Sequence, residues 1–147
     1  MVETPVLHVE KLTTRFRLGK QLVRVVDDVS FSLAQGQTLA LVGESGCGKT
    51  VTALSLLRIL PQIAEKPTGK VIYRGENLLE LSERGLRQLR GGKIAMIFQD
   101  PSSALNPVYT VGDQLDEVAA LHLGLTGEAA YVRALSALKE VGISSPE

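Results

Sequence analysis

The residues with the clearest capacity for chemistry lie between Gly43 and Thr50, where the sequence reads GESGCGKT. Every fixed position matches the phosphate-binding pattern G-x-x-x-x-G-K-[ST]. Glycines let the backbone turn its N–H groups toward an anion, and the helix that follows adds the positive end of its dipole. We expect Lys49 to reach the β- and γ-phosphates of a nucleotide and Thr50 to offer its hydroxyl to Mg²⁺. The alternative is a glycine-rich turn that binds nothing.

The phosphate-binding pattern is typical of a loop between a strand and a helix, and the sequence predicts both. Residues 38–42 are almost wholly apolar, as in a central parallel strand covered on both faces. A helix is predicted from Lys49 to about Leu60, because Pro61 ends it. Upstream, the predicted strands of an antiparallel hairpin are residues 6–12 and 22–33. A polar stretch at 13–21 separates them, and Asp27-Asp28 predicts a bend or a bulge in the second strand.

Downstream of the loop the pattern predicts a second part of the sheet and then helices. A strand at 70–73 is followed by a turn at 74–77, a helix from Ser82, its N-cap, to Arg90, and an apolar strand at 93–98. Residues 110–124 and 127–141 have the apolar i, i+3, i+4 spacing of helices. The predicted fold class is therefore α/β: a nucleotide-binding core with an antiparallel β flank, followed by the start of a helical subdomain.

Composition narrows the function classes. The chain has 147 residues, with 16 Lys+Arg against 16 Asp+Glu, so no basic field argues for a nucleic-acid partner. The single cysteine, Cys47, rules out an internal disulfide and fits a reducing compartment. Neither a signal peptide nor a run of about 18 apolar residues is visible, which predicts a soluble, cytoplasmic protein.

A second candidate position is Gln99, which follows the predicted strand at 93–98. Open α/β sheets bind ligands at the carboxyl ends of their strands. A glutamine there can contact Mg²⁺ and orient the attacking water of an ATPase. The alternative is an ordinary strand end, with a polar residue before the break at Pro101.

Taken together, these motifs resemble a known family. GESGCGKT, the run IAMIFQDP at 94–101 and the run ALNP at 104–107 resemble the nucleotide-binding subunits of ABC transporters. More narrowly, they are similar to the ATPases of bacterial dipeptide, oligopeptide and nickel importers. The longer run TLALVGESGCGKTVTALSLLRILP at 38–61 also resembles the ATPases of microcin C-type peptide importers. The resemblance extends from about residue 7 to residue 143.

The resemblance implies ATP and Mg²⁺ as ligands and assigns roles residue by residue. Lys49 and Gln99 would be catalytic, Thr50 and Gln99 would hold Mg²⁺, and Phe16 would stack on adenine. The positions it implies for nucleotide binding are Gly43, Glu44, Ser45, Gly46, Cys47, Gly48, Lys49, Thr50, Thr52 and Phe16.

The resemblance also implies partners. These are a second ATPase domain, transmembrane permease subunits and, indirectly, a periplasmic or extracellular binding protein. The segment around Asn106 would lie near the surface that meets the membrane subunit. The ATPase would then be peripheral on the cytoplasmic face of the cell membrane.

Several family motifs are absent from the 147 residues: the LSGGQ-type signature, the Walker B Asp with its catalytic Glu, and the switch His. His8 and His122 lack the context of the switch. We therefore expect residues 1–100 to be the N-terminal part of an ATPase core and residues 101–147 to begin the helical subdomain of a longer protein. The chain alone is expected not to turn over ATP.

Other functions remain open from the sequence. One is a catalytically dead nucleotide-binding fragment, and another is an importer ATPase for nickel or a different small solute. A small-molecule kinase would also contain a phosphate-binding loop, but it does not account for Gln99 or for the following Leu105-Asn106-Pro107.

Overall fold

The computed structural model describes residues 4–100 and 104–146, so Pro101 of the Gln99 motif lies outside the described part. The chain forms two compact units, which divide between Gln88 and Leu89 and are treated separately below. The division into a core and a helical subdomain at residues 100/101, which followed the positions of motifs, stays a prediction.

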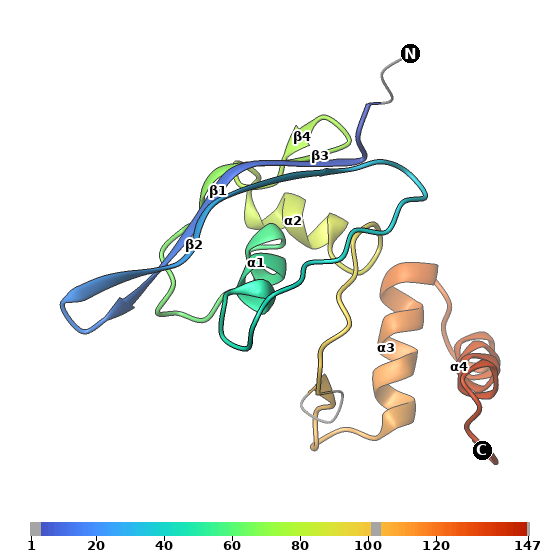
Figure 1. The fold of residues 1–147 in the computed structure, drawn as a ribbon. Helices are drawn as coiled ribbons and strands as arrows, with labels where there is room; N and C mark the ends of the chain where they lie inside the picture. Colours follow the sequence, from blue (N-terminus) through green and yellow to red (C-terminus); the bar gives the residue numbers. More distant parts are fainter. Residues whose placement is uncertain (1–3, 101–103, 147) are drawn as a thin grey trace. The chain divides into compact units, whose positions relative to one another are not determined.

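The first unit contains a four-stranded antiparallel sheet in the order β2-β1-β3-β4 (Figure 1). Its strands are β1 (Leu7–Leu18), β2 (Gln21–Leu33), β3 (Thr68–Tyr73) and β4 (Glu76–Asn77). The predicted hairpin is confirmed. The prediction of a polar, non-strand stretch at 13–21 is wrong, because β1 continues through Leu18. Polar residues are tolerated there since one side of the strand faces solvent and the backbone still pairs with β2.

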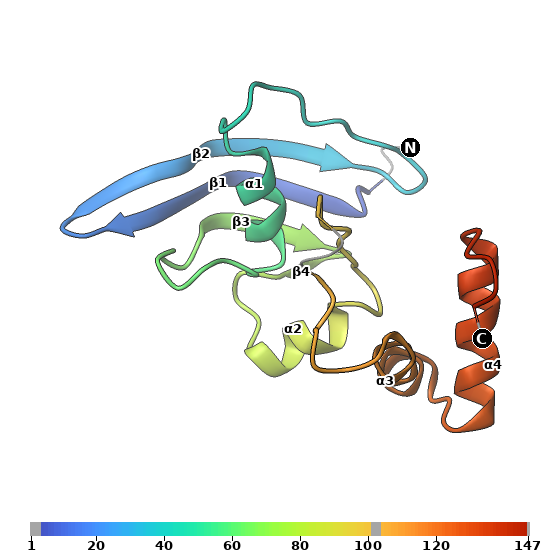
Figure 2. The ribbon, with the colours of Figure 1, turned by 90° about the horizontal axis from the view of Figure 1, so that it is seen from below.

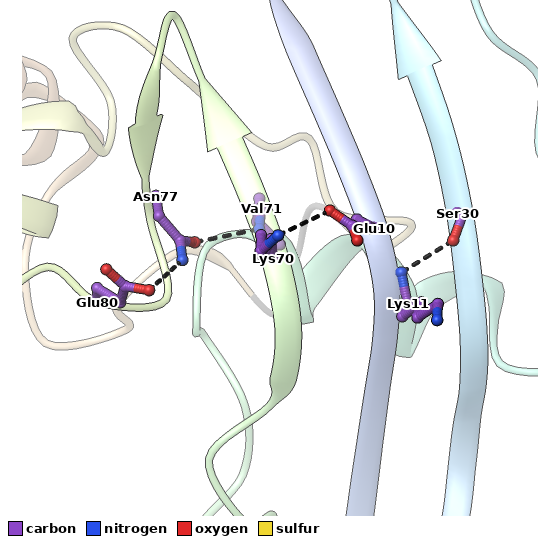
Figure 3. Close-up of polar contacts among 7 residues, drawn as sticks. All are labelled: Glu10, Lys11, Ser30, Lys70, Val71, Asn77 and Glu80. Atoms are coloured by element: carbon purple, nitrogen blue, oxygen red, sulfur yellow. Dashed lines mark hydrogen bonds and ion pairs between the residues drawn. The ribbon is translucent and has the colours of Figure 1, made fainter.

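Both strands of the hairpin are irregular. Asp28 has a φ of 52°, which confirms the bend predicted at Asp27-Asp28, and its N–H donates to the Thr13 hydroxyl at 3.1 Å. On β1, Lys11 has a φ of 50° and its N–H donates to Ser30 Oγ at 2.8 Å (Figure 3). These left-handed residues coincide with register shifts between the strands, as expected for β-bulges, which bend and twist a hairpin.

Polar contacts also hold β3 to its neighbours (Figure 3). Lys70 Nζ donates to Glu10 Oε2 at 3.0 Å, and this bond with its charge holds the pKa of Glu10 below the ordinary value. The Asn77 side chain accepts from the Val71 N–H at 3.2 Å and donates to Glu80 at 2.7 Å. The turn predicted at 74–77 thus contains the short strand β4.

Helix α1 (Lys49–Leu56) is shorter than predicted. Arg58 takes a left-handed φ of 54°, its N–H donates to Ser55 O at 3.2 Å, and the Ile59 N–H donates to Leu54 O at 2.9 Å. This is the Schellman arrangement, here without glycine. The Arg58 guanidinium donates to Leu81 O at 2.6 Å, which anchors the unusual conformation. The helix therefore ends before Pro61, at a turn whose Arg58 side chain makes a tertiary contact.

Helix α2 (Glu83–Leu89) begins where the sequence predicts. The hydroxyl of Ser82 accepts from the Gly85 N–H at 3.2 Å, which confirms Ser82 as the N-cap. Leu86 points into the core of the first unit and is fully buried.

The core of the first unit joins one side of the sheet to the helices. Helix α1 contacts β1 and β2, and lies against the hairpin in both views (Figures 1 and 2). The buried apolar side chains are Val9, Leu12, Val26, Leu57, Val71, Leu78, Leu79 and Leu86. Burial of such side chains contributes roughly 1.5–3 kcal/mol each, so this core fixes the helix that follows the glycine-rich loop.

Two predicted strands are wrong. Residues 38–42 and 93–98 pair with no strand in the described ranges, apart from an isolated bridge between Arg90 and Ile94. Val42 is 92% exposed and Ile97 is 96% exposed. An apolar run shows a tendency to be buried, but a strand also requires neighbours for its backbone N–H and C=O groups.

The second unit contains α3 (Val111–Leu123) and α4 (Glu128–Glu140), which pack against each other. The two predicted helices are confirmed. A capping box begins α3: Thr110 Oγ1 accepts from the Asp113 N–H, and the Asp113 carboxylate accepts from the Thr110 N–H, both at 3.1 Å. Gly124 ends α3 in the left-handed conformation.

The two histidines have structural surroundings. His8 Nδ1 lies 2.7 Å from Ser32 Oγ across the hairpin. The ring of His122 lies so close to Gly91 that a Cβ at this glycine would come within 2.6 Å of Nε2. Among the helices of the described residues, none has both the length and the apolar character that crossing a bilayer requires.

Candidate functional site

The loop between residues 43 and 50 depends on glycine at two points. Gly46 has a φ of 82° and Gly48, the N-cap of α1, has a φ of 97°. Gly48 also lies against β2, where a Cβ would come within 2.6 Å of the Val25 carbonyl oxygen. Only a residue without a side chain therefore fits at Gly48, because both the backbone conformation and the available space exclude a Cβ.

The carbonyl of Gly48 ties the loop to the helix. It accepts from the Thr52 N–H at 2.8 Å and from the Thr52 hydroxyl at 2.9 Å. Thr52, predicted to bind nucleotide, is buried, with its hydroxyl committed to this carbonyl. The structure thus places Thr52 where it holds the loop, and direct contact with a nucleotide stays a prediction.

Lys49 turns back into the loop. Its Nζ donates to the carbonyl oxygens of Gly43 and Glu44, both at 2.6 Å, and to Cys47 Sγ at 3.5 Å. The loop therefore surrounds an ammonium group, whose charge favours binding of an anion. Cys47 is exposed and packs over Gly43, where a Cβ would come within 2.6 Å of Sγ.

The start of α1 adds to this electrostatic preference. Its first turn carries no acidic side chain, so the positive end of the helix dipole is not offset there. Thr50 lies in this turn and is exposed. No cluster of three His, Cys, Asp or Glu residues occurs in the part of the chain that is described, and the role of Thr50 as a Mg²⁺ ligand stays a prediction.

Phe16 lies in the same unit as the loop. It pairs with Val23 on β2, two residues before the Val25 carbonyl that contacts Gly48. A bridge to Ala64 holds the other side of Phe16, next to the Arg17–Glu65 ion pair at 2.5 Å. β2 thus joins Phe16 to the glycine-rich loop, although stacking on adenine stays a prediction.

Gln99 is exposed and lies in the second unit. Its predicted roles, at Mg²⁺ beside Thr50 and at the attacking water, stay predictions. Asn106 lies in the same unit, and its Oδ1 accepts from the Val108 N–H at 3.0 Å.

Sequence reasoning missed two groups that support these segments. Thr14 and Ser55 form a buried hydroxyl pair between β1 and α1. Gln114 binds the backbone of residues 106–110 through its side-chain amide. The Thr14–Ser55 pair could have been suspected from the sequence, because each residue is polar and occupies an inward-facing position of its strand or helix. We find no sequence signal for the contacts of Gln114.

Comparison with known proteins agrees with this geometry. A family model described as "ABC transporter" matches residues 26–147. A probable peptide ABC transporter ATP-binding protein of Sinorhizobium fredii is 49% identical over 96% of this chain and 42% of its own length. A peptidoglycan transport ATP-binding protein of Agrobacterium fabrum is 46% identical over 97% of this chain and 26% of its own length. A dipeptide transport ATP-binding protein of Bacillus subtilis is 45% identical over 96% of this chain and 42% of its own length.

A solved structure has the same fold. It is a dimeric ATP-binding cassette in a post-hydrolysis state with ADP and Pi, which superposes with a TM-score of 0.79 at 22% identity. The match covers 95% of this chain and 58% of that chain. The present chain spans 26–42% of the length of the three relatives described above.

Proposed function

The chain belongs to the ABC transporter family, and on this premise we propose that it supplies the ATP-binding loop of an importer subunit that energises peptide uptake. The observation that carries the proposal is the position of the Lys49 ammonium, 2.6 Å from two carbonyls of a loop whose Gly46 and Gly48 have positive φ angles. Peptides are favoured as the substrate class because the names of two relatives refer to peptide or dipeptide transport.

Binding of ATP would redirect the hydrogen bonds of Lys49. Its ammonium carries three donors, and those that now meet Gly43 and Glu44 would turn toward the β- and γ-phosphate oxygens. The loop N–H groups and the start of α1 would neutralise further negative charge. Thr50, together with Gln99, would hold Mg²⁺, which supplies charge neutralisation at the phosphates when bound. Phe16 would stack on the adenine ring.

The proposed partners follow from the same premise. A second ATPase domain would complete the nucleotide site, in keeping with the dimeric cassette of the same fold. Transmembrane permease subunits would receive the motion, with the segment around Asn106 at the contact, and a periplasmic or extracellular binding protein would act indirectly. We place the assembled ATPase on the cytoplasmic face of the cell membrane.

Calorimetric titration with ATP and ADP, at matched salt and Mg²⁺, tests the binding step. Lys49→Ala should weaken affinity by about a hundredfold or more, because a charge-assisted contact to phosphate is lost. Lys139→Ala, on an exposed position of α4, is the matched control and should bind like the parent. Equal affinity of the Lys49→Ala and parent proteins would overturn the proposal.

The importer itself requires a second measurement. In cells that carry the change in the chromosomal gene, Lys49→Ala should abolish uptake of labelled dipeptide, with labelled nickel uptake followed in parallel. Gln99→Ala should keep ATP affinity and lower transport-coupled turnover. If Lys49→Ala leaves dipeptide uptake unchanged and abolishes nickel uptake, the proposed substrate is wrong and the importer transports nickel.

A further inference from the structure

One side chain of the second unit makes an unusual set of contacts with a neighbouring loop. Gln114 Oε1 accepts from the Asn106 N–H at 3.0 Å. Gln114 Nε2 lies within donating distance of three carbonyl oxygens, those of Asn106 at 3.1 Å, Tyr109 at 3.2 Å and Thr110 at 3.4 Å. Gln114 lies in the first turns of α3, and its side chain thus contacts backbone groups at both the start and the end of the loop.

The loop that Gln114 holds presents apolar side chains to solvent. Val108 is 82% exposed and Tyr109 is 61% exposed. The Asn106 side chain closes a local turn by accepting from the Val108 N–H, and the capping box at Thr110 fixes the other end. Between these two anchors, the Tyr109 N–H donates to the Asn106 carbonyl at 3.3 Å, and the Gln114 side chain adds contacts to both the start and the end of the loop.

We infer that Gln114 is a positioning residue, which fixes residues 106–110 in one conformation and thereby sets the surface that Val108 and Tyr109 offer to a partner. The inference deepens the proposed function and rests on it for the identity of the partner, a membrane subunit. Gln114 then acts on coupling between ATP turnover and the partner, and not on binding of the nucleotide.

The chemistry of the contact explains why an amide is needed. One end of the group must accept from an N–H while the other end donates to carbonyls, and only a primary amide offers both on one planar group of this length. A carboxylate at this position could still accept from Asn106 but could not donate, so its second oxygen would face carbonyl oxygens. An aliphatic side chain would leave both sides of the loop without these bonds.

Residue-resolved hydrogen exchange tests the positioning without any assumption about function. In Gln114→Leu, exchange of the Asn106 N–H should become about tenfold faster or more, while the amides within α4 change little. Gln88→Leu, the same substitution on an exposed position of α2, is the control and should change neither. Unchanged exchange at Asn106 would overturn the inference. A uniform loss of protection through α3 and α4 would also overturn it, because Gln114 would then stabilise the whole second unit and not this loop in particular.

Turnover in the assembled transporter tests the consequence. Gln114→Leu and Gln114→Glu should leave ATP affinity and basal turnover within about twofold of the parent, and should lower substrate-stimulated turnover by about fivefold or more. An equal loss of basal and stimulated turnover, or parent-like stimulation in Gln114→Glu, would overturn the role in coupling. Failure of the parent itself to bind ATP would instead overturn the proposed function. In that case the exchange measurement would still decide whether Gln114 positions the loop.

Discussion

The hydroxyl oxygen of Thr14 lies 2.7 Å from that of Ser55, and both side chains are fully buried between β1 and α1. Ser55 also donates to the Val51 carbonyl at 2.6 Å, which uses its only hydroxyl hydrogen. Thr14 is therefore the donor to Ser55. The pair joins the strand that carries Phe16 to the helix that carries Lys49.

This direction of donation predicts unequal effects of two substitutions. Ser55→Ala leaves the buried Thr14 hydroxyl without its acceptor and should lower the free energy of unfolding by about 1–3 kcal/mol. Thr14→Val removes the donor, keeps the shape and leaves Ser55 bonded to Val51, so it should cost less. Urea denaturation of both single variants and of the double variant measures this, and the double variant should be more stable than Ser55→Ala alone. A larger loss in Thr14→Val would show that Thr14 is not the donor.

The glycines of the loop predict a second pair of effects. Gly46→Ala places a Cβ at positive φ in open space and should cost about 1–2 kcal/mol of stability. Gly48→Ala adds an overlap with the Val25 carbonyl, so it should cost more and should also abolish nucleotide binding. Thermal unfolding and calorimetry compare the two variants. Equal stability and equal affinity would show that the contact between Gly48 and β2 has no energetic importance.

Cys47 offers a chemical probe of the loop. It is exposed, and its sulfur lies 3.5 Å from Lys49 Nζ. Maleimide should react at Cys47 and block nucleotide binding, because the adduct would occupy the loop that is proposed to surround the phosphates. Mg-ATP should slow the labelling, whereas Cys47→Ser should bind ATP and resist maleimide. Mass spectrometry follows the modification, and identical labelling rates with and without Mg-ATP would contradict occupancy of this loop.

The capping box of α3 predicts a dependence on pH. Hydrogen bonds from the side chain and then the backbone of Thr110 hold the pKa of Asp113 below its ordinary value of 3.8. A lowered pKa in the folded state means that the stabilisation is complete above the ordinary value and is lost as pH falls through the folded-state value. Protection of the Thr110 N–H should therefore persist from pH 7 down to about 4 and then decrease.

Asp113→Asn provides the comparison for that measurement, since the amide can still accept from Thr110 but does not titrate. The difference in Thr110 protection between parent and variant should change only at acid pH. A difference that is constant from pH 7 to pH 3 would exclude the Asp113 carboxylate as the titrating group.

The sequence predicted features that depend on neighbouring residues well, and it predicted the pairing of distant strands poorly. The motif at Gly43–Thr50, the hairpin and the helices at 110–124 and 127–141 follow from residue types at short spacing. The strands predicted at 38–42 and 93–98 were wrong because apolar composition does not identify a partner for the backbone. The end of α1 was predicted too late, because Arg58 leaves the helical conformation before the chain reaches Pro61. The contact of Thr14 with Ser55 spans 41 positions, which no local pattern encodes.

The close approach of Gly48 to the Val25 carbonyl has a consequence for the order of folding. A hairpin between adjacent strands forms in about 1–10 μs, whereas the approach of the loop to β2 must close a longer segment of chain. We therefore expect the loop to take its final shape after β2 has formed. A nucleotide that bound only the completed unit would, at 100 times its Kd, shift the folding equilibrium by about 2.7 kcal/mol through mass action alone.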